Sequence, residues 1–505
     1  MHKETSQDDL IYIKNQLEAG EPDLAMERII KCMDFDLDNP RLLFTAGLVL
    51  LRAKKYGLAY QMLYRAKELK PERPELYNAI GLVYQNMGEH YRAEKNFLKA
   101  IEKYPENHPG LDEAMNNLAL VYVNQCKYDQ GLEWAEKCLE LNPNMLEAQE
   151  SKSLALLAQG KWREGWVNYE SMLGVHKQRF ERTYCEPEEP RWDGAPGKVV
   201  VVYGEQGLGD EVYFSSCIPD ALKVCQQVII DCDYRLQGLF RRSFPSAIVY
   251  GTRFDDKCPW TLKHAIDARC SIGTLPKFFR NEDSEFPGTP WLIPDPQRKL
   301  QWQSLLDDLG PGPKIGLAWT GGNQWTGEER RSITLEALLP VIKSVPHGTF
   351  VSLQYKGDTE KEIRFFEDAH GIKIHHWERA VRKGCDVDDT AALISALDCI
   401  VSVTTSAIHL AGSIGTKAFC LVPEKPRWLY QTPGPYMKWY GTTVEKFKQS
   451  GTEWRIKEVA EAVAQYCGGG DAIHHRSRSK GNSINRSVPK EHEEARDNAD
   501  HGVTA

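Results

Sequence analysis

The first third of the chain repeats a pattern of apolar and small residues every 34 positions, counted from Gly47 to Gly81. One unit contains Leu43, Ala46, Gly47, Leu50, Ala59, Leu63, Ala66 and Pro71. The next contains Tyr77, Ile80, Gly81, Tyr84, Ala93, Phe97, Ala100 and Pro105. A third, displaced by four residues, contains Met115, Leu118, Ala119, Tyr122, Gly131, Ala135, Cys138 and Pro143. The pattern predicts pairs of helices, in which small residues allow close packing and prolines end every second helix.

This pattern resembles the tetratricopeptide repeat, a helix-turn-helix unit that stacks into a solenoid. Weaker units at 6–39 and 146–170 fit as its end units, which are usually atypical because one face meets water. The solenoid is expected to span residues 1–178, and a generic helical bundle is the alternative. Its concave face would bind a peptide, bind another subunit or brace the remaining chain, and the sequence does not choose among these.

A different pattern follows residues 179–197, which contain three prolines and two glycines and predict a linker. Short apolar runs then alternate with segments that can form helices, which is typical of a doubly wound α/β lobe. The strands predicted for a first lobe, residues 198–300, are 199–203, 228–231, 247–250 and 264–268. Those predicted for a second lobe, residues 301–467, are 314–319, 349–354, 372–376, 399–403 and 418–422.

Two Rossmann-like lobes joined near residues 295–312 would form a cleft where the carboxyl ends of their strands meet. Helices are predicted at 390–397 and 406–414. Residues 468–505 have few apolar side chains and no periodicity, which predicts a disordered tail. The fold class is therefore an α-helical solenoid followed by a two-lobed α/β part. The two parts are expected to fold separately because the linker divides them.

Composition and charge indicate which partners and which cellular location to expect. The net charge of -8 argues against nucleic acid as the main partner, and no apolar run approaches the ~20 residues that span a bilayer. The charged N-terminus lacks the apolar stretch of a signal peptide. The 13 cysteines form no CxxC pair, which favours reduced thiols over zinc ligands. We therefore expect a cytoplasmic protein.

The first candidate for a catalytic or ligand-binding segment is GEQGLGD at 204–210. Gly204, Gly207 and Gly209 would let the backbone approach a substrate between a strand and a helix N-terminus, which favours negative charge. Asp210 has two interpretations. It would cap the helix, or it would act as a general base at the mouth of the cleft.

The second segment is VSVTTSAIHLAGSIG at 401–415. Thr404, Thr405 and Ser406 would present hydroxyls and amides at a helix N-terminus, which suits a diphosphate. His409, about one turn into the helix, would donate to a phosphate oxygen. The alternative is a capping turn with a packed histidine.

The third segment is GLAWTGGNQWTGEERRSI at 316–333, a strand that runs into a long polar loop. Arg330 and Arg331 carry guanidinium groups that suit bidentate phosphate binding. Charges on a solvated loop are the alternative interpretation.

Together these segments resemble glycosyltransferase family 9, the lipopolysaccharide heptosyltransferase-like proteins, and especially members fused behind tetratricopeptide repeats. FVSLQYKGD at 350–358, DTAALISALD at 389–398 and the Trp/Tyr-rich segments 426–441 and 451–454 also match. The resemblance covers roughly residues 198–466. It implies a GT-B fold and an inverting transferase that uses a nucleotide-diphosphate sugar without a metal or other cofactor.

The same resemblance implies roles for residues at matching positions. Asp210 lies where the family places its general base, and Thr405, Ser406 and His409 lie where it binds the donor diphosphate. The predicted donor site also contains Thr404, Asn323 and Arg331. The chain departs from the family at Thr404, where an acidic residue is usual, and the departure leaves room for an inactive relative.

Two other classes of protein compete with this interpretation. A non-catalytic scaffold would bind a protein through its repeats and keep a degenerate transferase-like domain. A nucleotide-dependent oxidoreductase fits less well, because GEQGLGD is not GxGxxG. The expected partners are a nucleotide sugar and a protein, peptide or glycan acceptor held by the repeats, and oligomers are possible.

Overall fold

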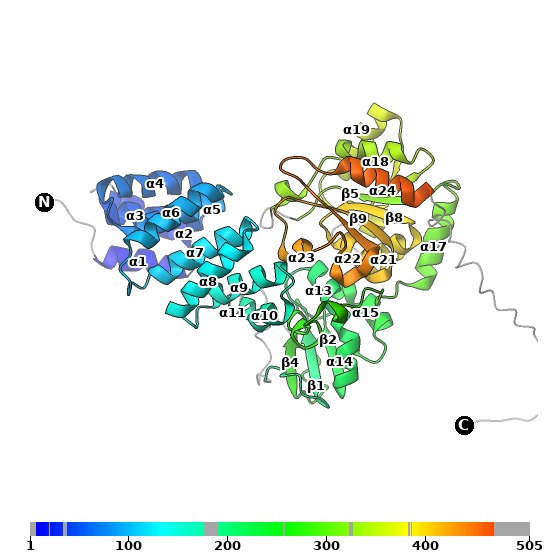
Figure 1. Cartoon of the computed structure of the whole chain (residues 1–505), viewed down its shortest axis with the longest axis horizontal. Coiled ribbons are helices and arrows are strands. Elements are labelled where there is room, and N and C mark those ends of the chain that lie inside the picture. Colours follow the sequence, from blue (N-terminus) through cyan, green and yellow to red (C-terminus); the bar gives the residue numbers. More distant parts are fainter. Residues whose placement is uncertain are drawn as a thin grey trace, which may run out of the picture.

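The computed structural model describes residues 7–19, 21–33, 38–175, 190–255, 258–322, 327–381, 384 and 386–468. An array of paired helices leads into an α/β part that contains two parallel sheets (Figure 1). No helix within these ranges is long and apolar enough to cross a membrane. Asn323 lies outside the described residues, and so does the tail predicted at 468–505 except for Gly468, which ends a helix.

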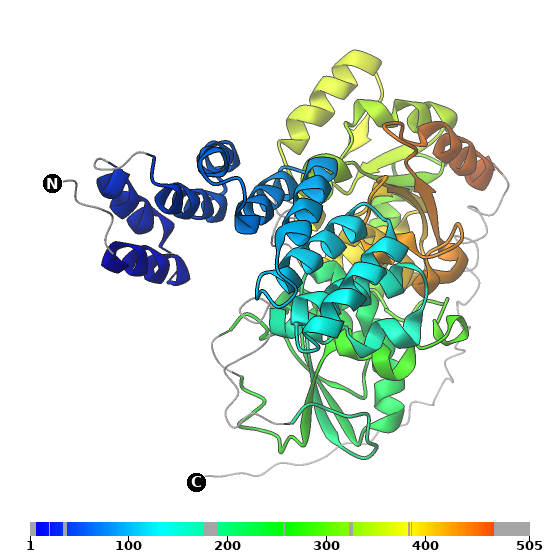
Figure 2. The same ribbon diagram turned by 60° about the vertical axis from the view of Figure 1, so that its left-hand side comes forward.

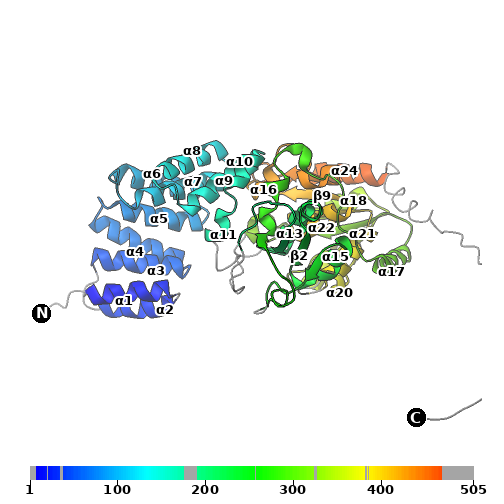
Figure 3. The same cartoon turned by 90° about the horizontal axis from the view of Figure 1, so that it is seen from below.

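The solenoid is a stack of antiparallel helix pairs, most easily followed from below (Figure 3). Its helices are α1 (Gln7–Glu18), α2 (Pro22–Met33), α3 (Pro40–Arg52), α4 (Tyr56–Leu69), α5 (Pro74–Asn86), α6 (His90–Lys103), α7 (Leu111–Asn124), α8 (Tyr128–Leu141), α9 (Leu146–Ala158), α10 (Trp162–Val167) and α11 (Ser171–Val175). The predicted tetratricopeptide repeats are confirmed.

Small residues set the spacing within each pair. A Cβ atom on Gly47 would lie 2.4 Å from Cγ of Leu63, and one on Gly81 would lie 2.5 Å from a ring carbon of Phe97. Carbon atoms that are not bonded to each other do not approach this closely, so a residue with a side chain does not fit at either position. Pro71 follows the last residue of α4 by two positions, as expected for a residue that cannot continue a helix.

The first lobe contains a four-stranded parallel sheet in the order β3-β2-β1-β4. Its strands are β1 (Val199–Tyr203), β2 (Gln227–Asp231), β3 (Ile248–Tyr250) and β4 (Ala268–Ser271). Its helices are α13 (Leu208–Phe214), α14 (Ile218–Val224), α15 (Gln237–Ser243) and α16 (Pro276–Phe279). The prediction of a strand at 264–268 was wrong by four residues. His264 belongs to a turn closed by the carbonyl of Trp260, and pairing with β1 begins at Ala268.

The second lobe contains a six-stranded parallel sheet in the order β10-β9-β8-β5-β6-β7. Its strands are β5 (Lys314–Ala318), β6 (Thr349–Ser352), β7 (Ile374–His375), β8 (Cys399–Val403), β9 (Lys417–Val422) and β10 (Val444–Lys448). Its helices are α17 (Pro296–Asp307), α18 (Leu339–Ser344), α19 (Thr359–His370), α20 (Glu378–Val381), α21 (Val387–Ala396), α22 (Ser406–Ile414), α23 (Trp428–Gln431) and α24 (Ile456–Gly468). The sequence did not predict β10, an edge strand whose residues after Val444 are only partly buried.

The last solenoid helices share a hydrophobic core with both lobes. Trp162 and Trp166 of α10 are buried among aromatic rings that include Phe214 of the first lobe and Trp428 and Trp439 of the second. The indole N–H groups donate to a side chain and a carbonyl of the first lobe. Figure 2 shows these helices lying across the α/β part. We expected the solenoid and the α/β part to fold separately. A hydrophobic core to which both parts contribute contradicts that expectation.

This shared core predicts a large effect of truncating Trp166, which is fully buried and donates to the carbonyl of Arg280 over 2.8 Å. Trp166→Ala should lower the free energy of unfolding by ~3–5 kcal/mol. The measurement is the midpoint of urea unfolding followed by circular dichroism. Val167→Ala is the control, because that side chain is 61% exposed, and its midpoint should not change. Equal midpoints for Trp166→Ala and the wild type would contradict a shared core.

Candidate functional site

A cavity of about 420 Å³ lies between the two lobes, at the carboxyl ends of their strands. The predicted residues that line it are Gly207, Gly209, Asp210, Arg331, Thr405, Ser406 and His409. Thr404 lines an adjoining cavity together with Arg331. Gly204 lies behind the cavity, where a Cβ atom would be 2.4 Å from the Glu211 carboxylate. The structure therefore gathers most of the predicted site in one place.

The N-termini of two helices meet at this cavity, α13 from the first lobe and α22 from the second. They approach closely because Gly209 has no side chain. A Cβ atom there would lie 2.9 Å from Cδ2 of His409 and 3.7 Å from Cα of Ser406. Any larger residue would push the lobes apart. Gly209 does not have a positive φ angle, so a glycine is required here by packing and not by the backbone conformation.

Asp210 caps the first turn of α13 and also lines the cavity, so the capping interpretation is confirmed and the role of general base stays a prediction. Its Oδ2 atom accepts from the backbone N–H of Gly207 over 3.0 Å, which closes the N-terminal turn of α13. Its Oδ1 atom accepts from the hydroxyl of Tyr213 over 3.2 Å and from Nη1 of Arg427 over 3.1 Å. The carboxylate is 7% exposed and lines the cavity. Capping therefore does not remove Asp210 from the cleft.

Arg427 connects Asp210 to the solenoid through Gln206. The Nη2 atom of Arg427 donates to Oε1 of Gln206 over 2.9 Å, and Nε2 of Gln206 donates to the hydroxyl of Tyr169 over 2.7 Å. Gln206 has a φ angle of 55°, a left-handed conformation that a non-glycine residue adopts only when its contacts stabilise it. The sequence analysis missed these three residues, although Arg427 belongs to a segment that matched the transferase family.

The turn after β8 provides the second half of the site. Thr405 is the N-cap of α22, and its hydroxyl accepts from the N–H of Ala407 over 3.2 Å. A hydrogen bond of 3.0 Å joins the hydroxyls of Thr405 and Ser402 and orients the cap. Ser406 begins the helix and lines the cavity. The first amides of α22 and its positive dipole end are therefore presented to an anion in the cavity.

His409 is held by two tyrosines. Its Nδ1 lies 2.9 Å from the hydroxyl of Tyr440, and its Nε2 lies 2.9 Å from the hydroxyl of Tyr430. Burial lowers the pKa of His409 to about 3, assisted by Arg427 and Arg331 and opposed by Asp210. The ring is therefore neutral near pH 7 with both nitrogens engaged. Direct donation to a phosphate stays a prediction, and it requires one tyrosine to turn away.

Arg331 reaches Thr404, the position where the transferase family usually carries an acid. Its Nε donates to Oγ1 of Thr404 over 3.1 Å, and its Nη2 donates to the carbonyl oxygen of the same residue. A guanidinium has five N–H groups, so the remaining donors are available to a ligand. Threonine thus orients Arg331 without neutralising it, whereas a carboxylate would form an ion pair with it.

The rest of the cavity is largely apolar. Leu353 and Tyr355 follow β6, and Val381 and Val387 come from α20 and the start of α21. An aromatic ring with aliphatic neighbours suits the flat face of a base. Within the described ranges, no group of three or more His, Cys, Asp and Glu side chains is placed to hold a metal ion.

Comparisons with known proteins agree on the repeats. Residues 72–144 match the tetratricopeptide repeat family. The chain is 30% identical to Protein FlbA of Caulobacter vibrioides over 382 residues, which cover 72% of this chain but only 62% of FlbA. It is 30% identical over 126 residues to the photosystem I assembly protein Ycf3 of Prochlorococcus marinus, covering 24% of this chain and 70% of Ycf3.

Among solved structures, MamA is 21% identical with a TM-score of 0.28, and the match covers 33% of this chain and 95% of MamA. The family match and the stacked helix pairs show that the N-terminal part of the chain is a tetratricopeptide-repeat array.

The environment of His409 predicts a pH dependence of stability. The unfolded histidine binds a proton near pH 6.5, whereas the folded one does so only near pH 3. Between these values the unfolded state binds more protons, so this residue contributes stability above pH 6.5 that is lost at ~1.4 kcal/mol per pH unit as the pH falls. His409→Gln, which can still bond to both tyrosines, should remove that part of the slope. Parallel pH profiles of the urea midpoint from pH 7 to 5 would contradict the prediction.

Proposed function

We propose that this chain is an inverting glycosyltransferase that moves a sugar from a nucleotide-diphosphate sugar to an acceptor hydroxyl. The observation that carries the proposal is the placement of Asp210 and the N-terminus of α22 beside one another in the lining of one interlobe cavity. A carboxylate that accepts a proton and a site that accepts a diphosphate are the two parts that such a transfer needs. The sequence resemblance to glycosyltransferase family 9, with its GT-B fold, supports the same assignment.

In the proposed complex the donor binds to the second lobe. Its diphosphate takes the amides of Thr405 and Ser406 and the free donors of Arg331, while its base packs against Leu353 and Tyr355. Charge on the leaving nucleotide diphosphate grows as the sugar departs, and these fixed donors stabilise it in the transition state. The resemblance implies that this stabilisation needs no metal.

Asp210 then removes the proton of the acceptor hydroxyl as that oxygen attacks the anomeric carbon. The new glycosidic bond forms while the bond from the anomeric carbon to the phosphate oxygen breaks, so the configuration inverts. A carboxylate offers about four acceptor positions, and Gly207, Tyr213 and Arg427 fill three of them. One position remains for the acceptor hydroxyl. Arg427 forms an ion pair with Asp210 over 3.1 Å and orients the carboxylate.

A non-catalytic scaffold is the second candidate, and one observation favours it. Thr404 replaces the acid that the transferase family usually carries, and it already accepts two hydrogen bonds from Arg331. In that case the repeats bind a protein partner and the α/β part binds nucleotide sugar without turnover. In either case the solenoid provides the partner-binding surface, with a protein, peptide or glycan as its ligand.

The role of Asp210 is tested by Asp210→Asn. Asparagine keeps a side-chain oxygen that can accept from the N–H of Gly207, so the fold should persist, whereas loss of the general base should reduce transfer by ~10²–10⁴-fold. The measurement is sugar transfer together with donor affinity by calorimetry, and the affinity should not change. Asp308→Asn, an exposed aspartate after α17, is the control. A variant with normal turnover and a lower unfolding temperature would reduce Asp210 to a cap.

The donor site is tested by Arg331→Ala. Losing charge-assisted hydrogen bonds to the diphosphate should weaken nucleoside diphosphate binding by ~1.5–3 kcal/mol, or roughly 10- to 150-fold. Arg364→Ala is the control, because Arg364 is an exposed residue of α19 that lines neither the interlobe cavity nor the cavity that adjoins it. Calorimetry that gives both variants the wild-type affinity for every nucleoside diphosphate would contradict the placement of the donor.

A further inference from the structure

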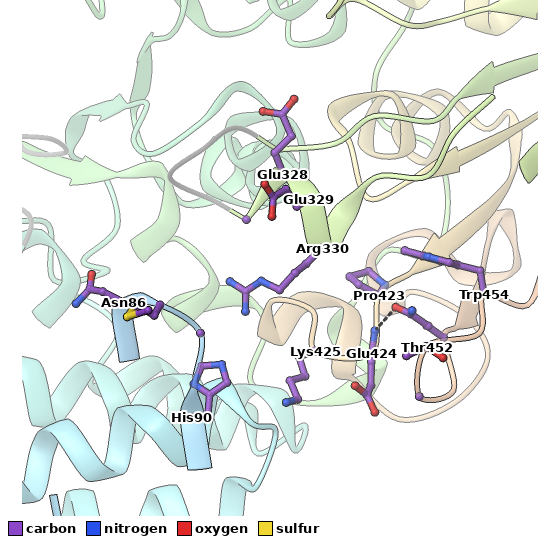
Figure 4. Close-up of a pocket in the computed structure, with 15 residues that line it drawn as sticks. Asn86, His90, Glu328, Glu329, Arg330, Pro423, Glu424, Lys425, Thr452 and Trp454 are labelled. Carbon is purple, nitrogen blue, oxygen red and sulfur yellow. Dashed lines mark hydrogen bonds between the residues drawn. The ribbon is translucent and has the colours of Figure 1, made fainter. Parts of the chain in front are cut away.

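A second and larger cavity lies where the solenoid meets the second lobe (Figure 4). Its volume is about 690 Å³. One wall is the turn between α5 and α6, from Asn86 to His90, and the other is built from three loops of the second lobe. The charged residues that these loops contribute to the cavity are Glu328, Glu329, Arg330, Glu424 and Lys425.

This cavity continues toward the interlobe cavity. An intermediate cavity of about 380 Å³ shares His90, Arg330 and Lys425 with the larger one. The same intermediate cavity shares Arg331 and Arg427 with the interlobe cavity that contains Asp210. The three cavities therefore form one path, which we call the solenoid groove. It runs from the repeats to the proposed general base.

Arg330 and Lys425 carry charges that the fold does not neutralise. Within the part of the chain that the structure describes, neither side chain forms an ion pair or a hydrogen bond. Glu329 and Glu424, the acids that adjoin Arg330 and Lys425 in sequence, also line this cavity, and Glu328 is paired with Lys356 over 2.8 Å. In Figure 4 the Arg330 guanidinium points toward His90 and Lys425, away from the carboxylates of Glu328 and Glu329. Like charges held together in this way cost stability until an anion separates them.

His90 provides an independent indication of a ligand. Both nitrogens of its ring are buried, and neither has a hydrogen-bond partner among the described residues. Burial, followed by the charges of Lys425 and Arg330, holds the pKa of His90 below its usual range. Buried polar atoms normally have partners, so two unmet ring nitrogens beside two unpaired cations indicate a site completed by something else.

We propose that the solenoid groove binds an acidic polypeptide segment, with its carboxylates on Arg330 and Lys425 and its backbone or side-chain polar groups on His90. A polypeptide fits because one wall belongs to a tetratricopeptide-repeat array, whose concave surface is extended. A chain fits better than a small anion because the charged groups are spread along a path of three cavities. The inference builds on the proposed function: the acceptor hydroxyl lies further along the same chain, next to Asp210.

The test uses two fluorescein-labelled ten-residue peptides, one alternating Ser and Glu and one alternating Ser and Lys, titrated with the full-length protein. Fluorescence anisotropy should show that the protein binds the acidic peptide and does not bind the basic one. The affinity for the acidic peptide should fall as the salt concentration rises to ~0.5 M. The double variant Arg330→Glu/Lys425→Glu should bind the acidic peptide ~10-fold or more weakly. Lys361→Glu/Arg364→Glu on α19 is the control, because it makes the same change in net charge at exposed residues outside the three cavities.

Three results would overturn the proposal. They are equal binding of the two peptides, equal loss of binding in the two double variants, and complete competition by inorganic phosphate at the concentration of the peptide. Asp210→Asn should bind the acidic peptide like the wild type. If that variant also keeps full transfer activity, the proposed function fails while the groove stands. If transfer depends on Asp210 but the acidic peptide does not bind, only the groove is wrong.

Discussion

The hydrogen-bonded contact between Arg427 and Asp210 is the interaction on which the site depends. It joins residues 217 positions apart and links the second lobe to the first across the cavity between them. The side chain of Gln206 holds Arg427 in place, because it forms one hydrogen bond with Arg427 and another with Tyr169 of the solenoid. The solenoid, the first lobe and the second lobe are therefore connected to the proposed base by three hydrogen bonds in series.

This arrangement explains why the repeats pack on the α/β part instead of hanging from a linker. The aromatic residues of α10 complete a core to which both lobes contribute, so the position of the solenoid is as well determined as that of the sheets. A rigid junction also keeps the concave face of the repeats aligned with the cavities that lead to Asp210. Partner binding and the proposed chemistry are then parts of one continuous surface.

Local signals in the sequence predicted most of the fold. The 34-residue repeat, the apolar runs of β1 and β8 and the turn before α22 depend on neighbouring residues, and they lie where the sequence placed them. Three of the five residues of the edge strand β10 are charged, and the strand gave no such signal. The role of Arg427 was also hidden, because a single arginine becomes informative only when distant segments meet. His409 was found, but its two tyrosine partners were not, because they come from segments distant in the sequence.

The central claim is that the interlobe cavity binds a nucleoside diphosphate, and it is tested most directly by a crystal structure of the full chain with the diphosphate that raises its unfolding temperature most. The account predicts density for the diphosphate at the N-terminus of α22, within hydrogen-bond distance of Arg331 and the amide of Ser406. A nucleotide bound elsewhere, or the absence of any stabilising nucleoside diphosphate at millimolar concentration, would contradict it.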